Sequence, residues 1–102
     1  MTIKKNKNVI SLCHYMEDEI NEIKETIDTL LLEDEIDLLF QIAYINDCIE
    51  NIEKYIIELQ SKFTTTDKFF LETTTTMEEL LDDRNLDELQ NKILELLKYV
   101  YN

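Results

Sequence analysis

Apolar residues recur along residues 38–63 at alternating steps of four and three, the heptad spacing of a helix that packs along one stripe. The positions are Leu38, Ile42, Ile45, Ile49, Ile52, Ile56, Leu59 and Phe63. Residues 9–30 repeat this spacing. The positions there are Val9, Cys13, Met16, Ile20, Ile23, Ile27 and Leu30. The pattern predicts two long helices, over residues 9–32 and 35–63, with coiled-coil-like heptad seams.

The join between these helices falls near Glu33 and Asp34, where the heptad register breaks. If the first seam continued, Asp34 and Asp37 would be buried carboxylates, which is costly. A turn there, with Asp34 as the N-cap of the second helix, avoids that cost and lets the two seams pack together as an antiparallel hairpin. One continuous helix over residues 9–63, with a one-residue skip, is the alternative, because the chain has no Gly to end a helix.

The segment after the second predicted helix is rich in threonine rather than in apolar residues. Residues 64–76 contain seven threonines, and threonine is a poor residue for a helix interior. We therefore predict a Thr-rich connection at residues 64–76. It holds a short apolar plug, residues 69–71 (Phe-Phe-Leu), which forms one helical turn capped by Asp67 and inserts between helices.

The C-terminal part shows two capping boxes, one beginning at Thr76 and one at Asn85. They predict a C-terminal helical segment over residues 77–101, with a short helix at 77–82 and a fresh start at Asn85. The heptad positions of the last helix are Leu86, Leu89, Ile93, Leu96 and Val100. Acidic residues near its start and lysines near its end suit the helix dipole.

These elements predict an all-α fold, a helical bundle built on a long antiparallel helical hairpin plus a shorter C-terminal helix. The 102 residues suit one domain, with a flexible basic tail at residues 1–8. The absence of Gly and Pro agrees with this fold, because tight turns between strands need residues that tolerate positive φ. Ile at both seam positions favours three or four packed helices, within one chain or in a dimer.

The formal net charge of −13 excludes some partners. Such a surface repels phosphate backbones and anionic membranes, so we expect no direct nucleic-acid binding and no membrane association. No window approaches 18 uncharged apolar residues, and no secretory signal is visible at the N-terminus. The two cysteines are then free thiols in a reducing setting, and we expect a cytoplasmic protein.

The residues that carry metal or catalytic chemistry are few. Cys13, His14 and Cys48 are the only cysteine or histidine ligands, and an adjacent Cys-His pair is poor spacing for one metal ion. A di-iron site in a bundle needs Glu-x-x-His on two helices, and the chain has one histidine. We therefore predict no metal, no cofactor and no catalytic residue, and we expect a protein that is not an enzyme.

Residues 38–45 are apolar nearly all round the helix, so they are expected to be buried on more than one side. Either the C-terminal helix and the plug cover them, or another molecule does. The candidate partner-interface residues are Leu39, Phe40, Ala43, Tyr44, Tyr99 and Tyr101. They indicate a non-enzymatic protein–protein interaction module. It would act through helix packing and oligomerisation in a larger assembly, with another protein or itself as partner.

Carboxylates gather on the outer faces of the two long helices. This acidic face comprises Glu17, Asp18, Glu22, Glu25, Asp28, Asp47, Glu50 and Glu58. One interpretation is a solvated face that keeps the protein soluble. The other is an acidic inhibitor whose carboxylates imitate the charge spacing of DNA and block a basic site on a partner, as antitoxins, immunity proteins or phage and viral anti-defence proteins do.

Overall fold

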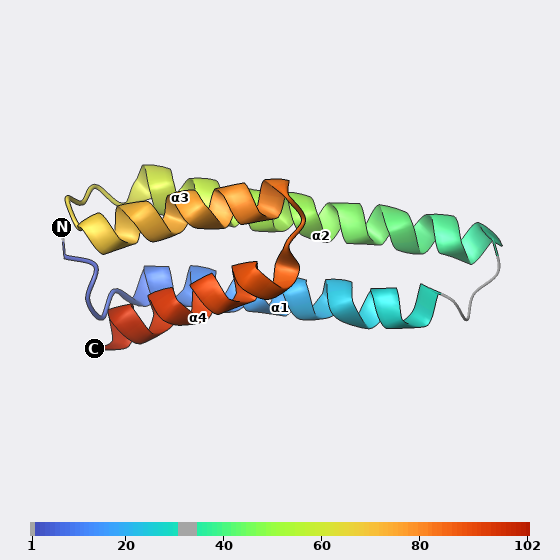
Figure 1. Cartoon of the computed structure of the whole chain (residues 1–102), viewed down its shortest axis with the longest axis horizontal. Coiled ribbons are helices and arrows are strands. Elements are labelled where there is room, and N and C mark those ends of the chain that lie inside the picture. Colours follow the sequence, from blue (N-terminus) through green and yellow to red (C-terminus); the bar gives the residue numbers. More distant parts are fainter. Residues whose placement is uncertain (1, 31–34) are drawn as a thin grey trace.

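The computed structural model describes residues 2–30 and 35–102, and within these it contains four helices and no strands. The helices are α1 (Lys7–Thr29), α2 (Glu35–Lys62), α3 (Lys68–Asp82) and α4 (Leu86–Tyr101). α1 and α2 run antiparallel as one long hairpin, and α3 and α4 form a second, shorter one (Figure 1). The all-α bundle on a long antiparallel hairpin is therefore confirmed, and the continuous-helix alternative is wrong. The turn predicted at Glu33 and Asp34 lies outside the described residues.

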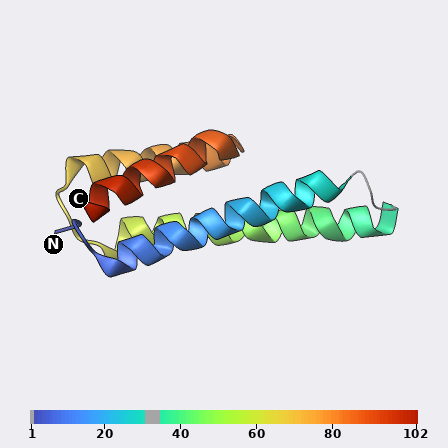
Figure 2. The same ribbon diagram turned by 90° about the horizontal axis from the view of Figure 1, so that it is seen from below.

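The short hairpin covers only the half of the long hairpin that lies next to the chain termini (Figures 1 and 2). In that half α4 packs on α1 and α3 packs on α2. The coverage follows from helix length, because the 16 residues of α4 span about 24 Å and the 28 of α2 about 42 Å. We call the covered part the four-helix half. The uncovered part, residues 25–30 and 37–47, we call the tip.

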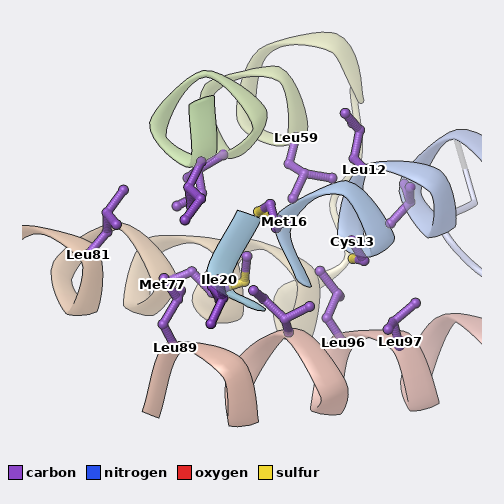
Figure 3. Packing of buried hydrophobic residues seen from close by; sticks show 14 of the residues in the cluster. Leu12, Cys13, Met16, Ile20, Leu59, Met77, Leu81, Leu89, Leu96 and Leu97 are labelled. Atoms are coloured by element: carbon purple, nitrogen blue, oxygen red, sulfur yellow. The ribbon is translucent and has the colours of Figure 1, made fainter. Parts of the chain in front are cut away.

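The core lies entirely in the four-helix half and the segments that close its end. Buried side chains from all four helices gather between them (Figure 3). The largest fully buried ones are Phe70, Ile3, Met16, Ile20, Ile23, Ile52, Ile56, Leu59, Met77, Leu89, Ile93 and Leu96. No described side chain from Lys24 to Asp47 is buried.

The two heptad seams are therefore buried along part of their length only. Ile52 and Ile56 are fully enclosed, whereas Ile42 of the same seam is 43% exposed. On α1, Ile23 is fully buried and Ile27 is 46% exposed. The same spacing has two outcomes because α3 and α4 supply partners for one half only. Coiled-coil packing of the whole seam stays a prediction.

The N-terminal segment differs from the flexible tail predicted at residues 1–8. Ile3 is buried in the core, and the backbone N–H of Lys5 donates to the Val100 carbonyl at 2.6 Å. Asn6 is the N-cap of α1, its side chain accepting from the backbone N–H of Val9 at 3.1 Å. One apolar side chain and one cap thus anchor the described residues 2–8.

The Thr-rich connection predicted at residues 64–76 is mostly wrong, because α3 begins at Lys68 and runs through all four threonines from Thr73 to Thr76. Thr73 and Thr74 are buried in the core. The hydroxyls of the other two bond back to carbonyls four residues earlier, as that of Thr76 does to Glu72 at 3.0 Å. Burial against α2 and α4 outweighs weak helix propensity, since propensity differences are only about 0.7 kcal/mol per residue.

The predicted caps have mixed outcomes. Asp67 is the N-cap of α3 and Asn85 that of α4, as predicted. Thr76 is a wrong cap, because it lies inside α3. Of the plug, Phe70 inserts fully into the core, whereas Leu71 is 44% exposed. The predicted short helix at 77–82 is the last part of α3.

Candidate interaction surface

The tip exposes large apolar side chains that no described part of the chain covers. Leu39 is 65% exposed, Phe40 72% and Ile42 43%, and Ala43 is exposed beside them. We call Ile27, Leu39, Phe40, Ile42 and Ala43 the tip face. An exposed apolar cluster of this kind is typical of an interaction site rather than of an ordinary surface.

The tip repeats on α2 the pattern that contacts α3 in the four-helix half. Leu39 and Ile57 are 18 residues apart, which is about five full turns, so they point in the same direction. Ile57 lines a small cavity together with Leu81 of α3. The same offset relates Ile42 to Gln60, whose side chain donates to Glu78 of α3 at 2.9 Å. Ile57 is still 51% exposed, so Leu39 and Ile42 continue the edge of the surface on which α3 docks.

A separate row of contacts holds α1 against α2 and does not involve the tip face. The Tyr44 hydroxyl donates to Glu22 Oε2 at 3.0 Å, and Asn51 donates to Glu19 Oε1 at 3.3 Å. The hydrogen bond to the Glu22 carboxylate, followed by burial, raises the pKa of Tyr44 to about 12. Tyr44, predicted as an interface anchor, is thus engaged within the chain, although its side chain is still 44% exposed.

The other two predicted anchors lie at the opposite end of the molecule, near the C-terminus (Figure 1). The Tyr99 ring stacks on Phe69 with centroids 4.4 Å apart, and Lys4 Nζ lies 3.6 Å from its centroid. The Tyr99 hydroxyl also donates to Asp67. Tyr101 is 55% exposed, with its hydroxyl 3.4 Å from His14 Nε2. Sequence reasoning grouped residues that the fold separates.

The predicted acidic face is likewise divided between the two halves. Glu25, Asp28 and Asp47 are exposed in the tip, and Glu50 lies just beyond it. The others lie in the four-helix half or at its border, and several have partners. The printed contacts are Glu17 with His14 at 3.1 Å, Glu22 with Tyr44, and Glu58 with Lys62 at 3.4 Å; Asp18 is exposed.

Two tip-face residues, Ile27 and Ile42, were predicted as seam residues and not as interface. Their spacing is that of core positions, so periodicity alone assigns them to a core. The only available signal was helix length, since a last helix starting at Asn85 is too short to pack along the full length of residues 35–63.

Cys13 and Cys48 contribute to packing in the interior of the bundle. Both are free and buried. Burial, with the Glu17 carboxylate second, raises the pKa of Cys13 to about 12, and burial followed by a hydrogen bond to Glu19 raises that of Cys48 to about 11. A thiol protonated at neutral pH is a poor nucleophile and metal ligand. Among residues 2–30 and 35–102, no three His, Cys, Asp or Glu side chains are grouped to hold a metal ion.

The chain matches no protein-family model, and neither curated proteins nor solved structures show a significant match to it. Within the described residues, none of the helices combines the length and the apolar character needed to cross a membrane.

Proposed function

We propose that this protein is a non-enzymatic interaction module that joins a larger assembly by helix packing, using the tip face as its docking site. The observation that carries the proposal is the exposure of Leu39, Phe40 and Ile42 at the uncovered end of α2. Five turns later on the same helix, Ile57 and Gln60, the counterparts of Leu39 and Ile42, lie at the edge of α3. Burying such a side chain stabilises a complex by about 1.5–3 kcal/mol before the costs of association.

The mechanism of binding follows from the four-helix half. There the long hairpin is completed by a second pair of helices that places its own apolar stripe on α1 and α2. A helix supplied by another protein, or by a second copy, would complete the tip in the same way. The row of contacts between α1 and α2 holds the two helices together without that partner, so the site is formed before binding.

The test compares the wild-type chain with Leu39→Ser/Phe40→Ser and with the control Leu71→Ser/Leu94→Ser. The control removes leucines of 44% and 40% exposure from the four-helix half. We expect the control to capture the same partner protein from the native source as the wild type, or to form the same dimer in light scattering. The tip variant should lose this capture or this dimer. Loss from both variants, or from neither, would overturn the proposal.

An acidic inhibitor that blocks a basic site is the alternative function. Its support is the net charge of −13 and the exposed carboxylates of Glu25, Asp28 and Asp47. Under this alternative, partner binding weakens steeply with salt and is abolished by Glu22→Lys/Glu25→Lys, because screening acts on exposed charges. Salt-insensitive binding that is lost on Phe40→Ser would favour the interaction module instead.

A further inference from the structure

The charge around the tip is of one sign. Residues 25–53 include no Lys, Arg or His. Where the structure describes the tip, its acidic residues are Glu25, Asp28, Asp37 and Asp47. The nearest cation on α1, Lys24, is already engaged, with Nζ 2.8 Å from Asp87 Oδ1 and 2.9 Å from Gln90 Oε1 of α4. An apolar surface thus lies in a strongly negative field.

This charge argues against a second copy as the occupant. Two tips packed face to face would bring the exposed carboxylates of Glu25, Asp28 and Asp47 of one copy near those of the other. Like charges brought together at an interface cost several kcal/mol. A cationic partner gains from the same field, because complementary charge speeds encounter and selects the partner.

The shape of the occupant follows from what α3 does in the four-helix half. α3 buries a stripe at helical spacing, formed by Phe70, Thr73, Thr74, Met77 and Leu81. Leu39 and Ile42 continue the edge of the α3-docking surface of α2 five turns nearer the start of that helix. A helix with an apolar stripe is therefore the element that matches it, as in other complexes where an amphipathic helix lies in an apolar groove.

Resting on the proposed function, we infer that the tip face binds a cationic amphipathic helix of another protein, whose apolar stripe packs on Ile27, Leu39 and Ile42 and whose flanking Lys or Arg side chains face the surrounding carboxylates. The apolar contact supplies most of the affinity. The charge supplies the preference for a basic partner over a neutral helix and over a second copy.

The experiment uses three labelled peptides of equal length as probes. The first carries a Leu stripe at heptad spacing with Lys on both flanks, the second has Gln in place of Lys, and the third is a scrambled version of the first without a stripe. Fluorescence anisotropy with the full chain gives each Kd at low and high salt. We expect the Lys-stripe peptide to bind at least about tenfold more tightly than either other peptide at low salt, with the gap over the Gln peptide narrowing at high salt.

Matched variants separate the two contributions. Leu39→Ser/Ile42→Ser should raise the Kd of the Lys-stripe peptide about tenfold or more, and Leu71→Ser/Leu94→Ser should leave that Kd unchanged. Glu25→Gln/Asp47→Asn in the tip should reduce the preference for Lys over Gln, whereas Glu79→Gln/Asp82→Asn in the four-helix half should leave it intact. Equal binding of the scrambled peptide would mean unspecific charge attraction and would overturn the inference.

The remaining outcomes distinguish this inference from the proposed function. If the Lys and Gln peptides bind equally and both are lost in Leu39→Ser/Ile42→Ser, the docking site stands and the cationic preference is overturned. If no peptide binds but the chain dimerises through the tip, the occupant is a second copy. If there is neither peptide binding nor self-association, and the native source yields no protein lost by the tip variant, both proposals fail.

Discussion

The four-helix half and the tip are built from the same two helices and the same heptad spacing, yet only one of them encloses a core. Ile56 is fully buried, while Leu38, at the same angular position five turns earlier, is half-buried. Leu39 is 65% exposed, and its counterpart Ile57, at the edge of α3, is still 51% exposed, so the contrast between the halves lies in the seam. Seam side chains of the long hairpin are thus enclosed only where α3 and α4 pack against them.

Removing a phenylalanine should strongly destabilise the fold in the four-helix half and hardly affect it in the tip. Phe70 is fully buried against Phe63, with ring centroids 6.4 Å apart, and Phe40 is 72% exposed. We expect Phe70→Ala to lower the free energy of unfolding by about 3–5 kcal/mol, and Phe40→Ala to change it by less than about 0.5 kcal/mol. Urea unfolding followed by circular dichroism measures both. Similar losses at the two sites would mean that the tip is covered within the chain.

Hydrogen exchange should divide the long hairpin at its midpoint. Amides near Ile27 and Ile42 lie in helices supported on one side only, whereas those near Ile20 and Ile56 lie around the common core. We expect the tip amides to open with a free energy lower by about 2 kcal/mol or more, because local stability follows buried contacts. Uniform amide protection along α1 and α2 would contradict the difference in stability between the two halves. Added protection confined to the tip when the Lys-stripe peptide is present would show that the peptide binds there.

Asp67 should control the stability of the four-helix half without affecting the tip. Its carboxylate caps α3 through the Phe70 N–H at 3.1 Å and accepts from the Tyr99 hydroxyl. Since both contacts are lost together, Asp67→Ala should cost about 1–2 kcal/mol. Peptide binding at the tip should stay unchanged. Loss of both stability and peptide binding in Asp67→Ala would show that the two halves are coupled.

The same contacts give this residue a pH dependence. The Tyr99 hydrogen bond, followed by the bond from the Phe70 N–H, lowers the pKa of Asp67 below its ordinary value, although burial opposes the shift. Because the folded-state pKa is the lower one, the stabilisation is fully present above the ordinary value of about 3.9 and is lost as the pH falls through the lowered pKa. Asp67→Asn keeps a capping oxygen and removes the charge, so the free energy of unfolding of this variant, measured in urea at several pH values, should lack this fall below about pH 4.

The smallest predicted change is at the turn between α3 and α4. Arg84 has φ of 58°, and the N–H of Asn85 donates to the Leu80 carbonyl at 2.9 Å, which closes a Schellman motif. A residue with a side chain is strained there, so Arg84→Gly should raise the free energy of unfolding by up to about 1 kcal/mol. Asp83→Gly, at φ of −80°, should lower it by about 0.5–1 kcal/mol. Thermal melts of the two variants that shift in the same direction would contradict this reading of the turn.

Much of the local structure was predictable because it depends on neighbouring residues. The seams predicted α1 and α2 to within a few residues, and the cap positions Asp67 and Asn85 follow from side chains that satisfy nearby N–H groups. Seam residues Leu89, Ile93 and Leu96 of α4 are buried as their spacing predicts. Each of these features is a short-range relation between positions a few residues apart, which periodicity and capping rules describe directly.

Other features depend on contacts between distant parts of the chain. Ile3 is buried at the end of the core and Lys5 donates to Val100, so the N-terminal segment is anchored by residues at the far end of the sequence. Thr73 and Thr74 are helical because α3 packs into the core despite their weak propensity. Such pairings cannot be read from periodicity, because several arrangements of the helices would satisfy the same pattern.

The sequence by itself determined that this chain forms amphipathic helices, where α4 begins, and that apolar side chains surround the helix at residues 38–45. Only the tertiary structure decided that α3 and α4 cover one half of the long hairpin and leave Leu39, Phe40 and Ile42 in solvent. The reason is that hydrophobic spacing specifies which side of a helix should be buried, whereas the lengths and positions of the other helices specify where along it a partner is present.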